Sequence, residues 1–528
     1  MTPPHSPGRR RFLQSAAVAT AAAGVGDIAT APTAAAITTP VHPALAPKLD
    51  LVTNQSWHLA RRAAHAPTPK LVAEITAMGA ARWVDLQLDW QKVPDVACQA
   101  MLDKHLPWLK LSTAELARVS GDRAWVGSSL MSHATAMRQV FSNRRLYESV
   151  VDAMGDQVYV GAAKADQWVM DFDRTVIRRY ALSNFSSLLA GAVRHPALLM
   201  FLDNDVNTKD SPNENLGREL LELHTVGEGV YTEADVRQSA LLLTGHSYDW
   251  TTRAYRFRPE QHHVGRVKVL GFTADNANAA DGPAVLDAYA RYLAWHPATA
   301  KRVCRRLAVR FVSDTPSDAL VADLAKVYLG SQTRIAPVVK ALFAHREFTA
   351  SVGKKWRRPQ EWMAAMTATG QPTWKPTAEA DQAGAPWKFY AYPSWLLTLA
   401  GHAPRGWHAV NGYPDVADYW TSTAAMLAAW NTAEAVAGRW DTEVVGRPWE
   451  AVYSLKVGEN IWTAVARMAY AATGYTWRRE DLSEIASMLC SNGSVVPKSD
   501  YALSADDIRW RLTEAVRLIL SSPYFLIR

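Results

Sequence analysis

The chain has 528 residues, of which 48% are hydrophobic and 20% are charged, and 57 Lys and Arg against 50 Asp and Glu give a net charge of +7. The basic residues are scattered in pairs along predicted helices, which argues against a nucleic-acid-binding protein. The three cysteines, Cys98, Cys304 and Cys490, match neither a zinc site nor a disulfide framework. We expect three buried thiols, although one disulfide is allowed.

The N-terminal residues have the features of a twin-arginine export signal in the expected order. Arg9 and Arg10 come first, an alanine-rich run over 16–23 is too short to span a bilayer, and small residues at 34–36 offer a cleavage site. We therefore expect residues 1–36 to be a signal peptide that directs the protein to the cell envelope or out of the cell. The alternative is a disordered tail. No later segment reaches about 18 consecutive apolar residues, so we expect no transmembrane segment after signal removal.

Helical periodicity dominates after a Pro- and Ala-rich linker at residues 37–50. The spacing predicts helices over 69–78 and 132–154, among others. Residues 248–271 are different, because aromatic and polar groups alternate there, which predicts a short hairpin or an ordered loop. The predicted fold class is all-α: a large multi-helix globular domain with at most a minor β ribbon near 248–271.

Residues 51–528 are long enough for one large helical domain. The alternative division is two intimate lobes, 51–250 and 283–528, on either side of the predicted ribbon.

An acidic loop between two predicted helices has part of the pattern of a calcium-binding loop. Asp203, Asp205 and Asn207 would supply its first, third and fifth positions, and Glu214 its twelfth. Thr208 stands where the tight turn of such a loop needs glycine. Calcium is therefore a candidate cofactor, and the alternative is a solvated loop with Asx turns.

The run SPNENLGRELLELHTVG at Ser211–Gly227 predicts a helix with both ends marked. Ser211 is the expected N-cap, and Gly227 can adopt the left-handed conformation that ends a helix. Three leucines share one stripe, which we expect to be the buried face: Leu216, Leu220 and Leu223.

Four side chains on and near this run are candidates for acid–base catalysis. Glu219 and Glu222 flank the apolar stripe, where loss of solvent can raise the pKa of a carboxyl group. His224 and His262 are histidines that the fold could bring beside them. The predicted catalytic residues are therefore Glu219, Glu222, His224 and His262.

The same residues allow a purely structural interpretation. Arg218 lies four residues from both Glu214 and Glu222, the spacing at which ion pairs stabilise a helix. His224 is favoured at a helix C-terminus without any function. In this interpretation the helix is locked to its neighbours by ion pairs and carries no chemistry.

The signature PNENxxRELxELHTxG, followed by YTxxDV and LTG, resembles a large bacterial family known only as domain of unknown function 1800. The resemblance is collinear along nearly the whole chain after the export signal. The other matching segments are His58–Pro69, Asn184–Asn204, Gln261–Gly271, Pro359–Trp362 and Trp407–Trp420.

One motif departs from the family pattern. Members commonly carry WHNHF, and Met154–Val158 reads MGDQV here, so Gly155 and Gln157 replace both histidines. The predicted function is an exported, hydrolase- or lyase-like enzyme that processes an envelope or extracellular polymer. The alternative is a non-catalytic scaffold or partner-binding protein with a degenerate site. The expected partner is a polymer or protein of the envelope or the extracellular space.

Overall fold

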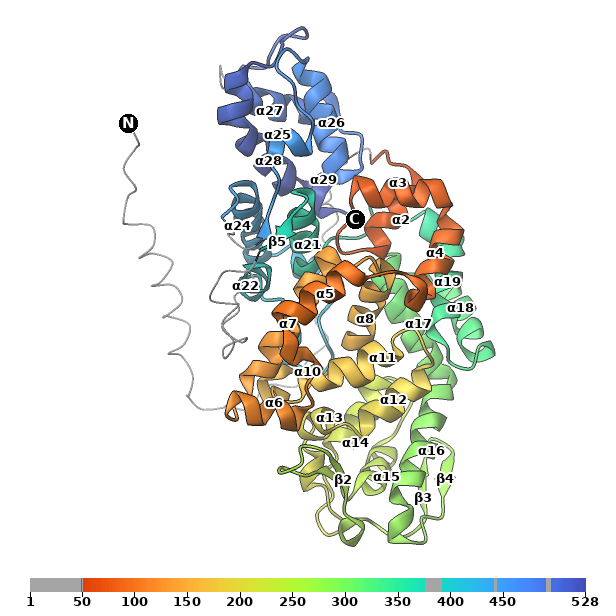
Figure 1. Ribbon diagram of the computed structural model, residues 1–528. Helices are drawn as coiled ribbons and strands as arrows, with labels where there is room; N and C mark the ends of the chain where they lie inside the picture. Colours follow the sequence, from red (N-terminus) through yellow and green to blue (C-terminus); the bar gives the residue numbers. More distant parts are fainter. Residues whose placement is uncertain (1–48, 50, 376–391, 441–443, 491–494) are drawn as a thin grey trace. The chain divides into compact units, whose positions relative to one another are not determined.

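The computed structural model describes residues 49, 51–375, 392–440, 444–490 and 495–528. The predicted signal peptide, 1–36, and nearly all of the predicted linker lie outside the described residues. Asp50–Arg528 form one compact unit (Figure 1). The described residues contain many helices and three two-stranded antiparallel sheets, so the all-α prediction is confirmed.

The first part of the unit is a series of helices joined by short turns. Figure 1 shows them in colours that run from red through orange to yellow. Their bounds are α2 (Gln55–Ala63), α3 (Pro69–Met78), α4 (Ala80–Leu88), η1 (Trp90–Lys92), α5 (Val96–His105), η2 (Pro107–Lys110), α6 (Thr113–Ser120), α7 (Trp125–Phe141), α8 (Arg145–Gln157), α9 (Ala162–Ala165), α10 (Val169–Phe172), η3 (Asp173–Ile177), α11 (Arg178–Tyr180), α12 (Phe185–Val193) and α13 (Pro196–Phe201).

The single helix predicted over 132–154 is two helices, α7 and α8. The carboxylate of Asp95 accepts hydrogen bonds from the Ser142 hydroxyl at 2.8 Å and from the Asn143 amide at 2.7 Å. An amide that is bonded to a side chain cannot continue the helical ladder, so the chain turns here. This break is important for the site, because α8 is a separate helix that does not continue the direction of α7.

The second part contains the signature run and the predicted ribbon. It consists of η4 (Asn204–Val206), α14 (Asn215–Glu219), η5 (Leu220–His224), α15 (Glu233–Leu243), β1 (His246–Tyr248), β2 (Tyr255–Phe257), η6 (Pro259–Gln261), β3 (Val267–Val269), β4 (Phe272–Ala274) and η7 (Ala279–Asp281). Strand β1 pairs with β2, with Ser247 opposite Arg256, and β3 pairs with β4, with Lys268 opposite Thr273. The predicted minor ribbon is thus two small hairpins.

The signature helix is shorter than predicted and begins at Asn215. Ser211 does not cap it, because the side-chain oxygen of Asn207 accepts the Asn213 amide at 2.9 Å and holds the preceding residues in a turn. From Leu220 the helix continues as the π-helical turn η5 and ends before Gly227, whose φ is +92° as a left-handed stop requires.

The π-helical turn changes which leucines are buried. Leu216 and Leu220 are fully buried as predicted, but the third buried leucine is Leu221, and Leu223 is half-buried. A π turn contains more residues than an α turn, so the side chains after Leu220 are rotated relative to the predicted stripe.

The remaining helices complete the unit. They are α16 (Gly282–Trp295), α17 (Pro297–Phe311), α18 (Asp318–Gly330), α19 (Ile335–Ala344), α20 (Arg346–Thr349), α21 (Pro359–Thr369), α22 (Tyr392–Leu399), α23 (Ala417–Trp420), α24 (Thr423–Ala437), α25 (Trp449–Val452), α26 (Ile461–Thr473), α27 (Arg479–Leu489), η8 (Asp507–Arg511), α28 (Leu512–Ser521) and α29 (Pro523–Leu526). Strand β5 (Thr373–Trp374) pairs with β6 (Val444–Val445).

Packing joins elements that are far apart in the sequence. Helix α12 packs on α16, and α8 packs on α17 (Figure 1). The C-terminal helix α28 packs on α24 and α27. One large hydrophobic core runs from Trp57 to Val444. All three cysteines are buried free thiols, as expected, and burial raises the pKa of Cys98 to about 12.

No helix within the described part of the chain is both long and apolar enough to cross a membrane.

Candidate functional site

Glu219 and Glu222 lie at the junction of α14 and η5 and have different surroundings. One carboxylate oxygen of Glu219 is buried and has no hydrogen-bond partner among the described residues. Burial, together with the charge of Glu222, raises the pKa of Glu219 to about 7. Glu222 accepts a hydrogen bond from the Tyr231 hydroxyl. Glu219 therefore has the electrostatics of an acid–base group, whereas Glu222 is held by its neighbour.

The structural interpretation expected Arg218 to pair with both Glu214 and Glu222, but Arg218 pairs with Glu233 and Glu214. Its two Nη atoms donate to both carboxylate oxygens of Glu233 at 2.7 Å, and Nη2 lies 3.3 Å from Glu214. The partner is Glu233 because α15 packs on α14 and places its first turn beside Arg218. The side chains are 34% to 61% exposed, so this is a surface ion-pair group.

His224 is buried against the end of α8. Its Nδ1 lies 3.3 Å from the Gln157 carbonyl oxygen, and Gln157 Nε2 donates to the His224 carbonyl oxygen at 3.1 Å. Burial lowers the pKa of His224 to about 4, so the ring is neutral at physiological pH. Gln157 occupies one of the two lost histidine positions, which places that motif in direct contact with the signature run.

His262 lies among the two hairpins. Its Nδ1 is 2.7 Å from the Thr244 carbonyl oxygen and its Nε2 is 3.0 Å from Asn276 Oδ1. Both ring nitrogens are therefore engaged by neighbouring protein groups. The structure places His224 against α8 and His262 beside Thr244 and Asn276, so each predicted catalytic histidine has its own set of contacts.

The four predicted calcium ligands do not converge. Asp203 forms an ion pair with Lys164, Asp205 accepts from the Tyr248 hydroxyl at 3.2 Å, and Glu214 pairs with Arg218. Asn207 uses its amide group within the loop. Across the described ranges, no group of three or more His, Cys, Asp or Glu side chains could hold a metal ion. The loop residues contact other protein groups instead, and calcium binding at this loop stays a prediction.

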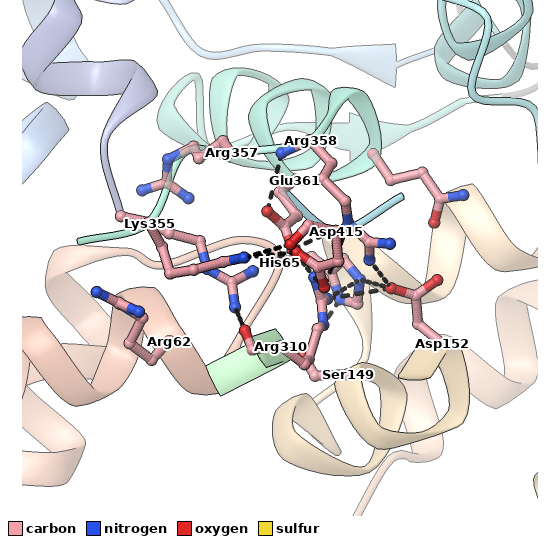
Figure 2. A network of polar contacts seen from close by, with 12 residues as sticks. Arg62, His65, Ser149, Asp152, Arg310, Lys355, Arg357, Arg358, Glu361 and Asp415 are labelled. Carbon is pink, nitrogen blue, oxygen red and sulfur yellow. Dashed lines mark hydrogen bonds and ion pairs between the residues drawn. The ribbon is translucent and has the colours of Figure 1, made fainter. Parts of the chain in front are cut away.

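The densest group of charges lies elsewhere, in the buried network of Figure 2. Arg358, which precedes α21, forms ion pairs with Asp152 and, at 3.1 Å, with Asp156, both on α8. Arg310 on α17 lies 3.1 Å from Asp152 and also pairs with Glu361 on α21. The Arg310, Arg358 and Glu361 side chains are at most 2% exposed.

The network extends to the last helix and to two loops. Arg528, just after α29, pairs with Glu361. Lys355 Nζ lies 2.6 Å from Asp314 and 2.8 Å from Asp415, and Arg310 lies 3.7 Å from Asp415. We call the set of residues that these ion pairs join the charge network. Its members are Asp152, Asp156, Arg310, Asp314, Lys355, Arg358, Glu361, Asp415 and Arg528.

The two aspartates of α8 have opposite electrostatic environments. Burial raises the pKa of Asp152, but Arg358 and Arg310 outweigh burial and hold this pKa well below its usual value. Burial and the adjacent charge of Asp152 raise the pKa of Asp156 above its usual value. Burial also lowers the pKa of Arg310 to about 9, with further lowering from Arg358 and Arg528. Two carboxyl groups of one helix thus titrate in different ranges.

A small cavity borders the network. Its volume is about 50 Å³, and Asp152, Asp156, Gln139, Gln360 and Tyr413 are among the residues that line it. This volume holds a few water molecules and is far below the roughly 300 Å³ at which ligand pockets begin. The cavity can hydrate the aspartates but does not have room for a sugar ring or a peptide unit.

Gly155, the second lost histidine position, also lines this cavity. The Nη1 of Arg405 donates to the Gly155 carbonyl oxygen at 2.7 Å. A Cβ at residue 155 would lie 2.8 Å from Nη2 of the same guanidinium. Arg405 therefore occupies the space that a larger side chain at this position would need, and the departure from the family motif is accommodated locally.

Sequence reasoning missed the charge network, although a signal for it was present. Three of the segments that carry the family resemblance contribute polar residues here, namely His65, Glu361 and Asp415, and the motif that departs from the family pattern contributes Asp156. His65 Nε2 lies 3.6 Å from Asp152. The signature run has many polar residues within one short segment, whereas the residues of the charge network are separated along the chain.

Comparisons with known proteins give one match. A model of the family described as "protein of unknown function (DUF1800)" matches residues 58–527. No curated protein and no solved structure matches the chain.

Proposed function

This chain belongs to the DUF1800 family, and from that premise we propose that it is an exported, non-catalytic protein that binds a polymer of the cell envelope. The charge network joins α8, α17, α21 and the C-terminal segment of this protein through buried ion pairs. The full chain has a net charge of +7, and removal of residues 1–36, which contain three arginines and one aspartate, leaves +5. This positive charge favours association with anionic polymers, which are abundant in bacterial envelopes.

The proposal rests on the observation that the charge network is buried and that its charged groups pair with one another. Its cations and carboxylates bind one another, and Arg310, Arg358, Glu361 and Arg528 are almost fully buried. Groups that act on a polymer must face an opening that admits the polymer, and the cavity beside the network has a volume of about 50 Å³. Of the predicted catalytic residues, Glu222 and His262 are bound by protein groups, and His224 contacts the Gln157 carbonyl oxygen through Nδ1. One carboxylate oxygen of Glu219 and the Nε2 of His224 are buried without a hydrogen-bond partner among the described residues.

A second candidate function rests on Asp152 and Asp156. A pair of carboxyl groups with opposite pKa shifts beside a cavity is the arrangement that acid–base enzymes use. A hydrolase- or lyase-like enzyme of the envelope would use Asp156 as the proton donor and the ionised Asp152 as its partner. The small cavity and the ion pairs of Asp152 favour the non-catalytic function.

One experiment separates the two. The exported protein and its Asp156→Asn variant are incubated with purified envelope polymer, and both the co-sedimented protein and the released soluble fragments are measured. The proposal predicts that both proteins sediment with the polymer and that neither releases fragments. Fragments that the wild type releases and the variant does not would establish the enzyme. A protein that stays in the supernatant would contradict polymer binding.

A further inference from the structure

A cleft of about 460 Å³ lies at the C-terminal end of α21, whereas the charge network contacts the start of this helix. The cleft has the size of a small-molecule site. Five segments line it: the start of α3, the corner between α7 and α8, the end of α21, the end of α25 and the last turn of α26. None of the predicted site residues and none of the charge network is among its lining residues.

The charged side chains that line the cleft are all positive. Lys70 and Arg145 are its charged lining residues, and both are basic. Arg145 Nη1 donates to the Val140 carbonyl oxygen at 2.9 Å, which fixes the guanidinium and leaves its other N–H groups for a ligand. Lys70 is exposed in the first turn of α3, where the helix dipole also favours an anion. An oxyanion would therefore meet two cations and a helix N-terminus.

The other polar groups of the cleft suit hydroxyl groups. Tyr453 is buried, and within the described ranges its hydroxyl has no hydrogen-bond partner. The last residues of α7 and α21 also line the cleft, at Phe141 and Thr369, and carbonyl groups at a helix C-terminus have no partner within the helix. Carbonyl oxygens and a free phenol can bind neutral hydroxyl groups without further charge.

We propose that this cleft binds a small oxyanion that also carries hydroxyl groups, of the class of sugar acids and sugar phosphates. Lys70 and Arg145 bind the carboxylate or phosphate, and the Tyr453 hydroxyl binds the neutral part of the molecule. The inference goes beyond the proposed function, because a soluble ligand can bind here whether or not the protein binds a polymer.

The test is a calorimetric titration of the exported protein with glucuronate and with glucose 6-phosphate, with glucose as the neutral probe. We expect at least one of the two anions to bind, and to bind about tenfold more tightly than glucose, because charge-assisted hydrogen bonds are the stronger ones. The two anions distinguish a carboxylate ligand from a phosphate ligand. Soluble probes make the result independent of the polymer experiment.

Two variants and one control complete the design. Lys70→Ala should weaken binding about tenfold, and Tyr453→Phe should weaken it several-fold. Lys104→Ala, at an exposed lysine that does not line the cleft, should bind like the wild type. Thermal melts of all variants check the fold. Absence of binding of both anions at millimolar concentration, or binding that is unchanged in Lys70→Ala and in Tyr453→Phe, would overturn the proposal.

Discussion

Glu219 has a buried carboxylate oxygen without a partner in the described part of the chain, and its pKa of about 7 results from burial and from Glu222. An unfolded glutamate has a pKa of about 4.3, so the folded state binds the proton more tightly. The contribution of Glu219 to stability is therefore fully present below about pH 4 and is lost as the pH rises toward 7.

Glu219→Gln removes this charge and keeps the size of the side chain. We expect the variant to be more stable than the wild type at pH 8 by roughly 1 kcal/mol, a value reduced for the partial exposure of the side chain. At pH 4 the two proteins should melt at the same temperature. Thermal melts at both pH values test this, and a variant that is less stable at pH 8 would show that the charge has a partner.

Arg218→Ala tests the ion pairs of the signature helix. Because these side chains are one third to more than half exposed, the substitution should cost at most about 1 kcal/mol of unfolding free energy. Urea denaturation measures the cost, and Glu233→Ala is the matched control because it removes the Arg218–Glu233 pair from the other side and leaves the Arg218–Glu214 pair in place. A loss of several kcal/mol would mean that the group is buried in solution.

At the scale of one element, α8 places Asp152 and Asp156 one turn apart with different roles. The depressed pKa of Asp152 means that its stabilisation is present above an unfolded pKa of about 3.9 and is lost as the pH falls below it. The raised pKa of Asp156 makes stability change with pH in the opposite direction, because the charged form of this carboxyl group is disfavoured in the folded protein.

Isosteric substitutions separate these roles. Asp152→Asn leaves Arg358 and Arg310 without their shared carboxylate and should cost about 3–5 kcal/mol at pH 7. Asp156→Asn should change the unfolding free energy by less than about 1 kcal/mol, since the amide replaces a disfavoured charge. Urea denaturation of both variants provides the comparison, and equal losses would contradict the different environments.

Local sequence rules predicted the elements better than they predicted the contacts between them. Residues 69–78 form α3 as predicted, since Thr68 caps the helix and Pro69 starts it. The break between α7 and α8 depends on Asp95, nearly fifty residues earlier, and could not be seen from periodicity. The start of the signature helix at Asn215 likewise depends on the Asn207 side chain.

The candidate site shows the same limit. The raised pKa of Glu219 follows from its place beside an apolar stripe, which periodicity can locate. The partner of Arg218 is Glu233, from the next helix, and the contact between His224 and Gln157 joins elements 67 positions apart. Such pairings depend on how helices pack, so residue spacing within a single helix does not determine them.

At the scale of the whole molecule, export is the prediction on which the proposed function depends most. The twin-arginine segment lies outside the described residues, so the test is made in the cell. Replacing Arg9 and Arg10 by lysine should leave the precursor in the cytoplasm, because that transport route reads the arginine pair. Immunoblots of cytoplasmic and exported fractions measure the outcome. Unchanged export of the lysine variant would contradict the proposed route.

The charge network connects α8, α17, α21, two loops and the segment after α29, and the account holds that this tie is structural (Figure 2). Glu361 is its most buried carboxylate, 1% exposed, and it binds both Arg310 and Arg528. Removing one partner of a buried ion pair leaves the other charge uncompensated, which costs far more than losing an exposed pair.

The most direct test is the unfolding free energy of Glu361→Gln, measured by urea denaturation beside Arg218→Ala. The account predicts a loss of about 3–5 kcal/mol for the buried Glu361 and at most about 1 kcal/mol for the exposed Arg218. Equal small losses in the two variants would contradict the claim that the charge network holds the protein together.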